Sequence, residues 1–164
     1  MTRTEPADFE REIIANVREH GCHINYIFDA NEDTPAFAYS VGFPETIDQP
    51  EIIVFGLPMD MMKFIINETM RKCREGLRLE DGLEIPGLLA GHVCMALEIP
   101  RANITREYFN SAMWFRRHVA GEEMDAAFQI VWPGAQDGLF PWDDGCSEIV
   151  RWSQPPLATE TGLS

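Results

Sequence analysis

Glu51-Ile52-Ile53-Val54-Phe55-Gly56-Leu57 is a nearly continuous apolar run. Apart from one carboxylate and one glycine, every residue in it is apolar, so it lacks the alternation of a strand with one solvated face. A continuous apolar run of this length is expected of a central strand that is covered on both faces. We therefore expect a sheet with other elements packed above and below it.

The sequence before this run predicts a helix and then a β-hairpin. Asp8 is placed to cap the helix and Gly21 to end it. The polar turn at 31–35 joins two stretches with strand periodicity. Phe28 falls on the apolar side of the first of these stretches, together with Ile24 and Tyr26. The predicted elements are, in order, a helix over 7–20, a strand over 22–29, a strand over 36–41 and a loop over 44–50.

The sequence after the run alternates between helices and strands. Thr105 is expected to cap the second of the helices, with Val119 on its buried side. The predicted elements are a helix over 59–75, an irregular stretch over 77–91 with at most one short strand, a strand over 92–99, a helix over 105–119, a strand over 127–132, a loop over 133–146, a strand over 147–152 and a loose tail from residue 153.

These elements predict a single α+β domain. Its sheet should be mainly antiparallel or mixed, with about five to six strands and about three helices packed on it. The 164 residues are a usual length for one domain. We expect that domain to span residues 1–157 and to be followed by a flexible tail over 158–164.

The charge of the chain restricts its partners. The 27 acidic and 13 basic residues give a formal net charge of −14. Such a field repels phosphate, so nucleic acid and anionic membranes are not expected partners, whereas a basic protein or a cationic small molecule is. No apolar segment is long enough for a signal or a membrane span, and the four cysteines form no C-x-x-C pair. We therefore expect a cytoplasmic protein with reduced thiols.

Several short motifs that combine glycine, proline and aromatic residues follow one another along the chain. They are Gly21-Cys22-His23, Ala38-Tyr39-Ser40-Val41-Gly42-Phe43, Pro50 to Leu57, Gln129-Ile130-Val131-Trp132-Pro133, Asp137 to Asp143, and Gln154-Pro155-Pro156-Leu157. Over residues 21–157 the chain resembles the bacterial family of unknown function called DUF4262. The resemblance implies a domain boundary but no chemistry. Gly134 stands where that family commonly has an acid, a place that Asp137 would have to fill here.

The loop from Trp132 to Gly145 is the strongest local feature, with two tryptophans, two prolines, three aspartates and three glycines. Aromatic walls beside carboxylates suit a cationic or planar ligand. Alternatively, the aromatic residues anchor the loop to the sheet and the aspartates shape its turns. The candidate ligand-binding residues, in this loop and in the family motifs, are Tyr39, Glu51, Gln129, Trp132, Asp137, Trp142 and Asp143.

Glu51 is the candidate for acid–base chemistry, because burial at the start of an apolar strand would raise its pKa. Alternatively, its carboxylate holds the backbone amides of a turn. His23, His92 and Cys94 are the candidates for metal ligands, with His92 and Cys94 on one face of a strand. No second pair of ligands completes such a site, so we expect hydrogen-bonded histidines, an inert thiol and no metal.

Three functions remain open at this point. The first is a binding or interaction module that uses loop 132–146. The second is a small hydrolase that uses Glu51, His23 or the same loop, and the third is a flavin-binding domain; the cofactor is unknown. Whether the protein is an enzyme stays undecided. A homodimer through the methionine-rich helix 59–75 is a further expectation.

Overall fold

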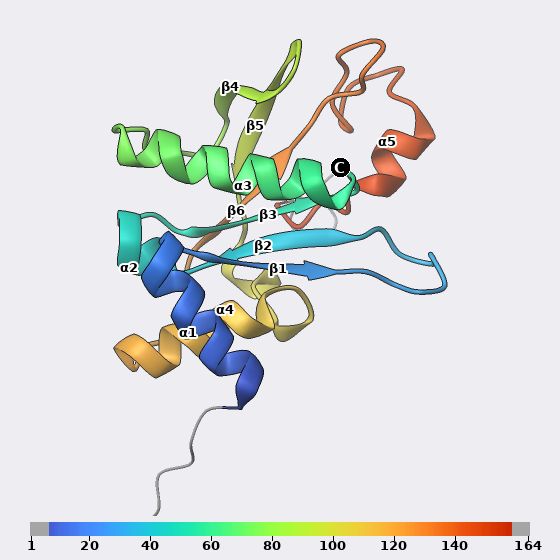
Figure 1. Cartoon of the computed structure of the whole chain (residues 1–164). Coiled ribbons are helices and arrows are strands. Elements are labelled where there is room, and N and C mark those ends of the chain that lie inside the picture. The colour runs from blue at the N-terminus through green and yellow to red at the C-terminus, as the bar shows by residue number, and fades with distance from the viewer. Residues whose placement is uncertain (1–6, 159–164) are drawn as a thin grey trace, which may run out of the picture.

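The computed structural model describes residues 7–158 and contains five α-helices and six strands within them (Figure 1). The order of the elements is α1 (Asp8–His20), β1 (His23–Ile27), β2 (Phe37–Val41), α2 (Phe43–Ile47), β3 (Glu51–Phe55), α3 (Met59–Arg74), β4 (Leu83–Leu89), β5 (His92–Glu98), the 3₁₀ helix η1 (Arg101–Asn103), α4 (Arg106–Ala120), β6 (Ala127–Val131) and α5 (Glu148–Ser153).

The six strands form one mixed sheet with the order β1-β2-β3-β6-β5-β4. The pair β3–β6 is parallel, and the other four pairs are antiparallel. Every residue of β3 and of β6 is buried. The apolar run at 51–57 is thus the central strand that its sequence predicts, and the α+β fold class is confirmed.

Helices cover both faces of the sheet (Figure 1). Ile52 and Val54 pack in one core with Met62 and Ile66 of α3. The alternate residues of β3 pack on the opposite face, in a core that includes Ile13 of α1 and Phe109, Ala112 and Phe115 of α4. Because successive strand residues point to opposite faces, a strand within two such cores has to be apolar at nearly every position.

Two short helices replace elements that the sequence predicts differently. Residues 44–50 were expected to be a loop, but α2 occupies most of this stretch, after Gly42 with a φ of 106°. The strand predicted over 147–152 is wrong, because this stretch is α5. The side chain of Ser147 caps α5 by accepting a hydrogen bond from the amide of Val150 (3.4 Å). A run of six residues is too short for its apolar pattern to separate helix from strand.

The 77–91 stretch is more regular than its composition suggests. β4 is a full seven-residue strand that pairs with β5 and contains an irregularity between Ile85 and Leu89. In β5 the buried side chains are Cys94 and Ala96, whereas Val93 is exposed.

Several predicted details of the helix ends and faces are wrong. Ala7 and not Asp8 is the N-cap of α1, and its amide donates to the carboxylate of Glu10 (2.8 Å). Thr105 does occupy the N-cap of α4, but its hydroxyl makes no capping bond. Val119 is exposed although helical periodicity places it on the buried side of its helix, and Phe9 of α1 is exposed too. Within the described residues, no helix is long and apolar enough to cross a membrane.

The segment after α5 is docked on the sheet instead of forming a loose tail from residue 153. Gln154 donates to the carbonyl of Trp132 (2.8 Å) and accepts from its amide (3.0 Å). Gln129 bonds the segment further on, through the carbonyl of Pro155 and the amide of Leu157. Leu157 is buried in the core beneath α4. Of the tail predicted over 158–164, residues 159–164 lie outside the described residues.

Candidate functional site

Glu51 is buried at the start of β3, with 3% of its surface exposed, and its carboxylate is fully engaged from within the protein. The hydroxyl of Ser40 donates to Oε1 (2.7 Å), and the amides of Gly42 and Phe43 donate to Oε2 (2.7 Å) and Oε1 (3.1 Å). Burial raises the pKa of Glu51 to about 8, although these three hydrogen bonds act in the opposite direction. The carboxylate therefore joins the end of β2 to the start of α2, as the structural alternative predicts.

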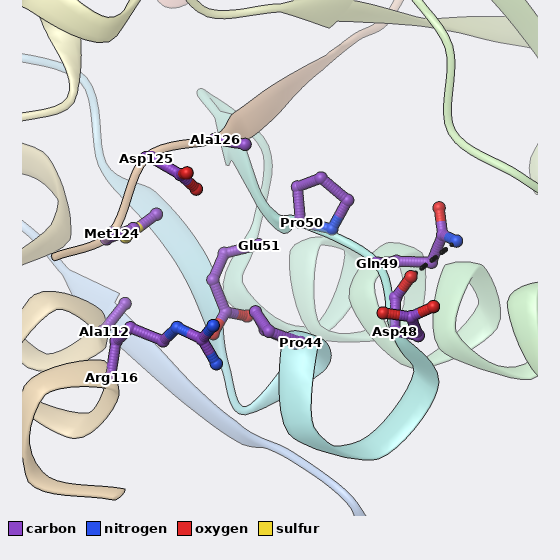
Figure 2. Close-up of a pocket in the computed structure, with 10 residues that line it drawn as sticks. All are labelled: Pro44, Asp48, Gln49, Pro50, Glu51, Ala112, Arg116, Met124, Asp125 and Ala126. Atoms are coloured by element: carbon purple, nitrogen blue, oxygen red, sulfur yellow. Dashed lines mark hydrogen bonds between the residues drawn. The ribbon is translucent and has the colours of Figure 1, made fainter. Parts of the chain in front are cut away.

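A pocket of about 190 Å³ opens beside Glu51 (Figure 2). Its lining residues are Pro44, Asp48, Gln49, Pro50, Glu51, Ala112, Arg116, Met124, Asp125 and Ala126. Arg116 is engaged by two other carboxylates, because its guanidinium donates to Glu45 (2.5 Å) and to Glu122 (2.7 Å). Glu51 and Arg116 are thus already bonded to other parts of the chain, and the carboxylates of Asp48 and Asp125 also line the pocket.

Tyr39 is buried in a polar network and not in a pocket. Its hydroxyl accepts hydrogen bonds from the side chain of Asn25 (2.8 Å) and from the amide of Ser111 (2.9 Å). His23 continues this network, because Asn16 donates to its Nδ1 (2.9 Å) and its Nε2 donates to Asn25 (3.2 Å). Burial lowers the pKa of His23, which fits a neutral ring with one donor and one acceptor.

Gln129 and Trp132 hold the C-terminal segment in place. Gln129 is almost fully buried and bonds Pro155 and Leu157, as described above. Trp132 is also buried, and its indole Nε1 donates to the carbonyl of Phe55 (2.7 Å). Neither side chain faces a ligand site, so both candidates have structural roles.

The aspartates of loop 132–146 shape its turns. Asp137 accepts from the amide of Leu139 (2.9 Å), and Asp143 accepts from the amide of Phe140 (2.8 Å). The Asp137 carboxylate lies so close to Gly134 that a Cβ at position 134 would meet it at 2.8 Å. Asp137 therefore occupies the space beside position 134.

The structure separates the candidates that a hydrolase would have to bring together. Glu51 pairs with Ala127 at the start of the parallel strands β3 and β6. Trp132 follows the far end of β6, five residues after Ala127, so loop 132–146 begins at the opposite end of these strands, roughly 16 Å away at about 3.3 Å per residue. Both ring nitrogens of His23 face asparagines and not Glu51.

The proposed metal ligands do not converge either. His92 donates from Nε2 to the carbonyl of Ala135 (3.0 Å), which ties the start of β5 to the loop. Cys94 is completely buried, and burial raises its pKa to about 12. The described residues contain no group of three or more His, Cys, Asp or Glu side chains that could hold a metal ion.

Several large apolar side chains are instead exposed on and around α5. Of these, only Trp142 is among the candidate binding residues that the sequence indicated. Phe28 is 65% exposed, Ile149 65%, and Trp142 and Trp152 50% each. Ile149 and Trp152 lie three residues apart on the exposed side of α5, while Val150 and Ser153 face inward. Trp142 stacks on Phe140 with ring centroids 4.8 Å apart.

These side chains stand on a rigid base. Arg151 of α5 donates to the carbonyls of Pro141 and Asp143, which flank Trp142 (2.9 Å each). Gly56 lets the end of β3 approach the end of α5, since a Cβ there would meet the carbonyl oxygen of Ser153 at 2.4 Å. We call Phe28, Trp142, Ile149 and Trp152, together with the carboxylates of segments 26–36 and 133–153, the aromatic–acidic surface.

A groove of about 510 Å³ runs through this surface between the β1–β2 turn and α5. Phe28 borders it on one side and Trp152 on the other, and Leu57 and Gly56 also line it. In Figure 1 the hairpin β1–β2 and α5 project on the same side of the molecule. The groove combines concavity, aromatic rings and carboxylates with no lysine or arginine among the described residues of its lining, whereas the pocket beside Phe9 and Trp114 is also lined by Arg106 and Arg117.

The fold and this surface define a class of protein, a small acidic α+β domain whose mixed sheet lies between helices. The chain belongs to the family described as "Domain of unknown function (DUF4262)", whose model matches residues 16–147. The match confirms the resemblance seen in the motifs, although it begins before residue 21 and ends before the Gln154–Leu157 motif. No curated protein and no solved structure matches the chain.

Proposed function

We propose that this domain is a protein-interaction module that binds its partner through the aromatic–acidic surface. The observation that carries the proposal is the exposure of Phe28, Trp142, Ile149 and Trp152 around one short helix. Contiguous exposed apolar patches are uncommon on soluble monomers and mark binding sites. Tryptophan in particular is enriched among the residues that dominate binding energy.

The rigidity of the surface supports this function. Val150 anchors α5 in the core beneath α3, and the hydrogen bonds of Arg151 fix the loop that carries Trp142. Binding to an ordered surface loses less conformational entropy than binding to a mobile loop. The aspartates of loop 132–146 contribute to this order, since Asp137 and Asp143 each accept a hydrogen bond from a backbone amide of a turn.

The charge of the same surface favours a basic partner. Segments 26–36 and 133–153 together contain seven carboxylates and a single basic residue, Arg151. The carboxylates are Asp29, Glu32, Asp33, Asp137, Asp143, Asp144 and Glu148. Complementary charge at the rim of an interface raises the association rate and rejects acidic competitors.

The test compares one double variant with a matched control. Phe28→Ser combined with Trp152→Ser removes two exposed rings, whereas Phe9→Ser removes an equally exposed ring (60%) from α1. Quantitative affinity capture from lysate with each protein identifies partners that depend on the surface, and calorimetry with the purified partner then gives the affinity. We expect the double variant to bind at least about 30-fold more weakly.

The control should bind like the unmodified protein. All three proteins should be folded under the conditions of the binding assay, which circular dichroism checks, although the double variant should lose some stability because half of Trp152 is covered. A specific partner that binds the double variant with unchanged affinity would show that the domain interacts through some other surface.

A further inference from the structure

The groove between the β1–β2 turn and α5 has a specific chemistry. Tyr26 and Phe28 stack with their ring centroids 5.8 Å apart on one side, and Trp152 stands on the other. An aromatic face attracts an ammonium or guanidinium group within about 6 Å of its centre. The groove therefore offers rings from two separate elements to one inserted side chain.

Carboxylates lie at the same place, and that of Asp29 is held by hydrogen bonds. Asp29 lines the groove and accepts hydrogen bonds from the amides of Asn31 (3.0 Å) and Asp33 (3.2 Å). Glu32 lines it too, held on a backbone with a φ of 57°. No lysine or arginine is among the groove-lining residues of the described chain. An inserted anion would thus meet only repulsion.

We infer that this groove takes an arginine or lysine side chain from a basic segment of the partner, an inference that rests on the proposed interaction function. The aliphatic stem would lie along Leu57 and the aromatic walls, as basic side chains do on apolar surfaces. The charged end would lie near Asp29 and Glu32. Arginine fits best, because a planar guanidinium stacks on rings and bonds carboxylates at its edge.

The experiment selects peptides without assuming a partner. A displayed library of random 12-residue peptides is panned on the unmodified full-length chain, and enriched peptides are retested on Phe28→Ser, on Trp152→Ser and on the control Phe9→Ser. We expect enriched peptides to carry arginine or lysine beside apolar residues. They should lose binding to the first two variants but not to Phe9→Ser.

Two further measurements test the charge directly. Replacing the arginine of an enriched synthetic peptide by citrulline keeps its shape without its charge, and should weaken binding about tenfold. Glu32→Gln should weaken it roughly threefold, whereas Glu12→Gln on α1 should leave it unchanged. Binding should also fall as the salt concentration rises.

The possible outcomes separate this inference from the proposed function. Neutral or acidic peptides that need Phe28 and Trp152 would overturn the inference and leave the interaction function standing. Peptides that bind both serine variants, or no enrichment at all, would overturn both. A concentration-dependent dimer that Trp152→Ser dissociates in size-exclusion chromatography would also overturn the inference, because a second copy would then cover the groove.

Discussion

Glu51 and the surface around α5 are two places where the polarity of a side chain does not match its environment, and the fold treats them differently. Glu51 is a polar group in an apolar interior, where it meets donors from Ser40, Gly42 and Phe43. Trp152 and Phe28 are apolar groups at the surface, where 50% and 65% of their area is exposed. A buried polar group with internal partners is accounted for by the fold, whereas a patch of exposed rings marks a candidate binding site.

Residue type and environment single out different side chains in this protein. Glu51, Tyr39 and Gln129 belong to residue types that often act on ligands, yet each one bonds its own chain. Phe28 and Ile149 are ordinary core residues by type, yet both are exposed. The relevant question for each side chain is thus whether its bonding and burial needs are met within the fold.

The largest expected effect is the loss of stability when Glu51 is replaced. Glu51→Ala leaves the amides of Gly42 and Phe43 without an acceptor in the interior, and each orphaned donor costs about 1–3 kcal/mol. We expect the free energy of unfolding to fall by about 3–5 kcal/mol, measured by urea denaturation. The control Glu12→Ala, at an exposed position on α1, should change it by less than about 0.5 kcal/mol. A loss below 1 kcal/mol for Glu51→Ala would show that water replaces the carboxylate.

Glu51 should also make the stability of the domain depend on pH. The pKa of Glu51 is about 8 in the folded chain and near 4.5 when unfolded, so the folded state holds the extra proton between these values. Stability from this group is fully present below about pH 4.5 and is lost as pH rises through 8. Each unit of pKa difference corresponds to about 1.4 kcal/mol.

Glu51→Gln should remove this loss, so its free energy of unfolding should fall less between pH 5 and pH 9 than that of the unmodified chain. The comparison between the two proteins is needed because His23 acts in the opposite direction. Its folded pKa is lowered, so its contribution to stability grows as pH rises through about 6.5. Parallel pH profiles for the two proteins would mean that Glu51 titrates alike in both states.

The smallest effect is expected at Thr105, the exception to the rule that buried polar groups are bonded. Its hydroxyl is the one buried side-chain oxygen or nitrogen of the described residues that lacks a partner. Thr105→Val keeps the shape and removes the oxygen, so it should leave the free energy of unfolding unchanged or raise it by up to about 1 kcal/mol. Thermal unfolding measures the change. A loss of more than 1 kcal/mol would reveal a bound water that satisfies the hydroxyl.

Local periodicity predicted most of the helices and strands correctly. The helices α1, α3 and α4 and the strands β1, β2, β3, β5 and β6 all lie where the pattern indicates them, within a few residues. Short elements were less predictable. α5 has only six residues, so the contacts of Val150 with the core, and not the pattern, make it a helix.

The central strand and the turn-forming aspartates could be predicted from the sequence, because both depend on residues that are neighbours in the chain. The net charge follows from the composition, and the fold class from the order of the predicted helices and strands. The hydrogen bonds of Glu51 with Ser40 and with the Gly42 amide depend on tertiary packing. So does the groove that Phe28 and Trp152 border, since these residues are 124 positions apart in the sequence. The physical reason is that burial and bonding partners depend on which distant segments pack together, and the packing of β3 against α5 at Gly56 sets that arrangement.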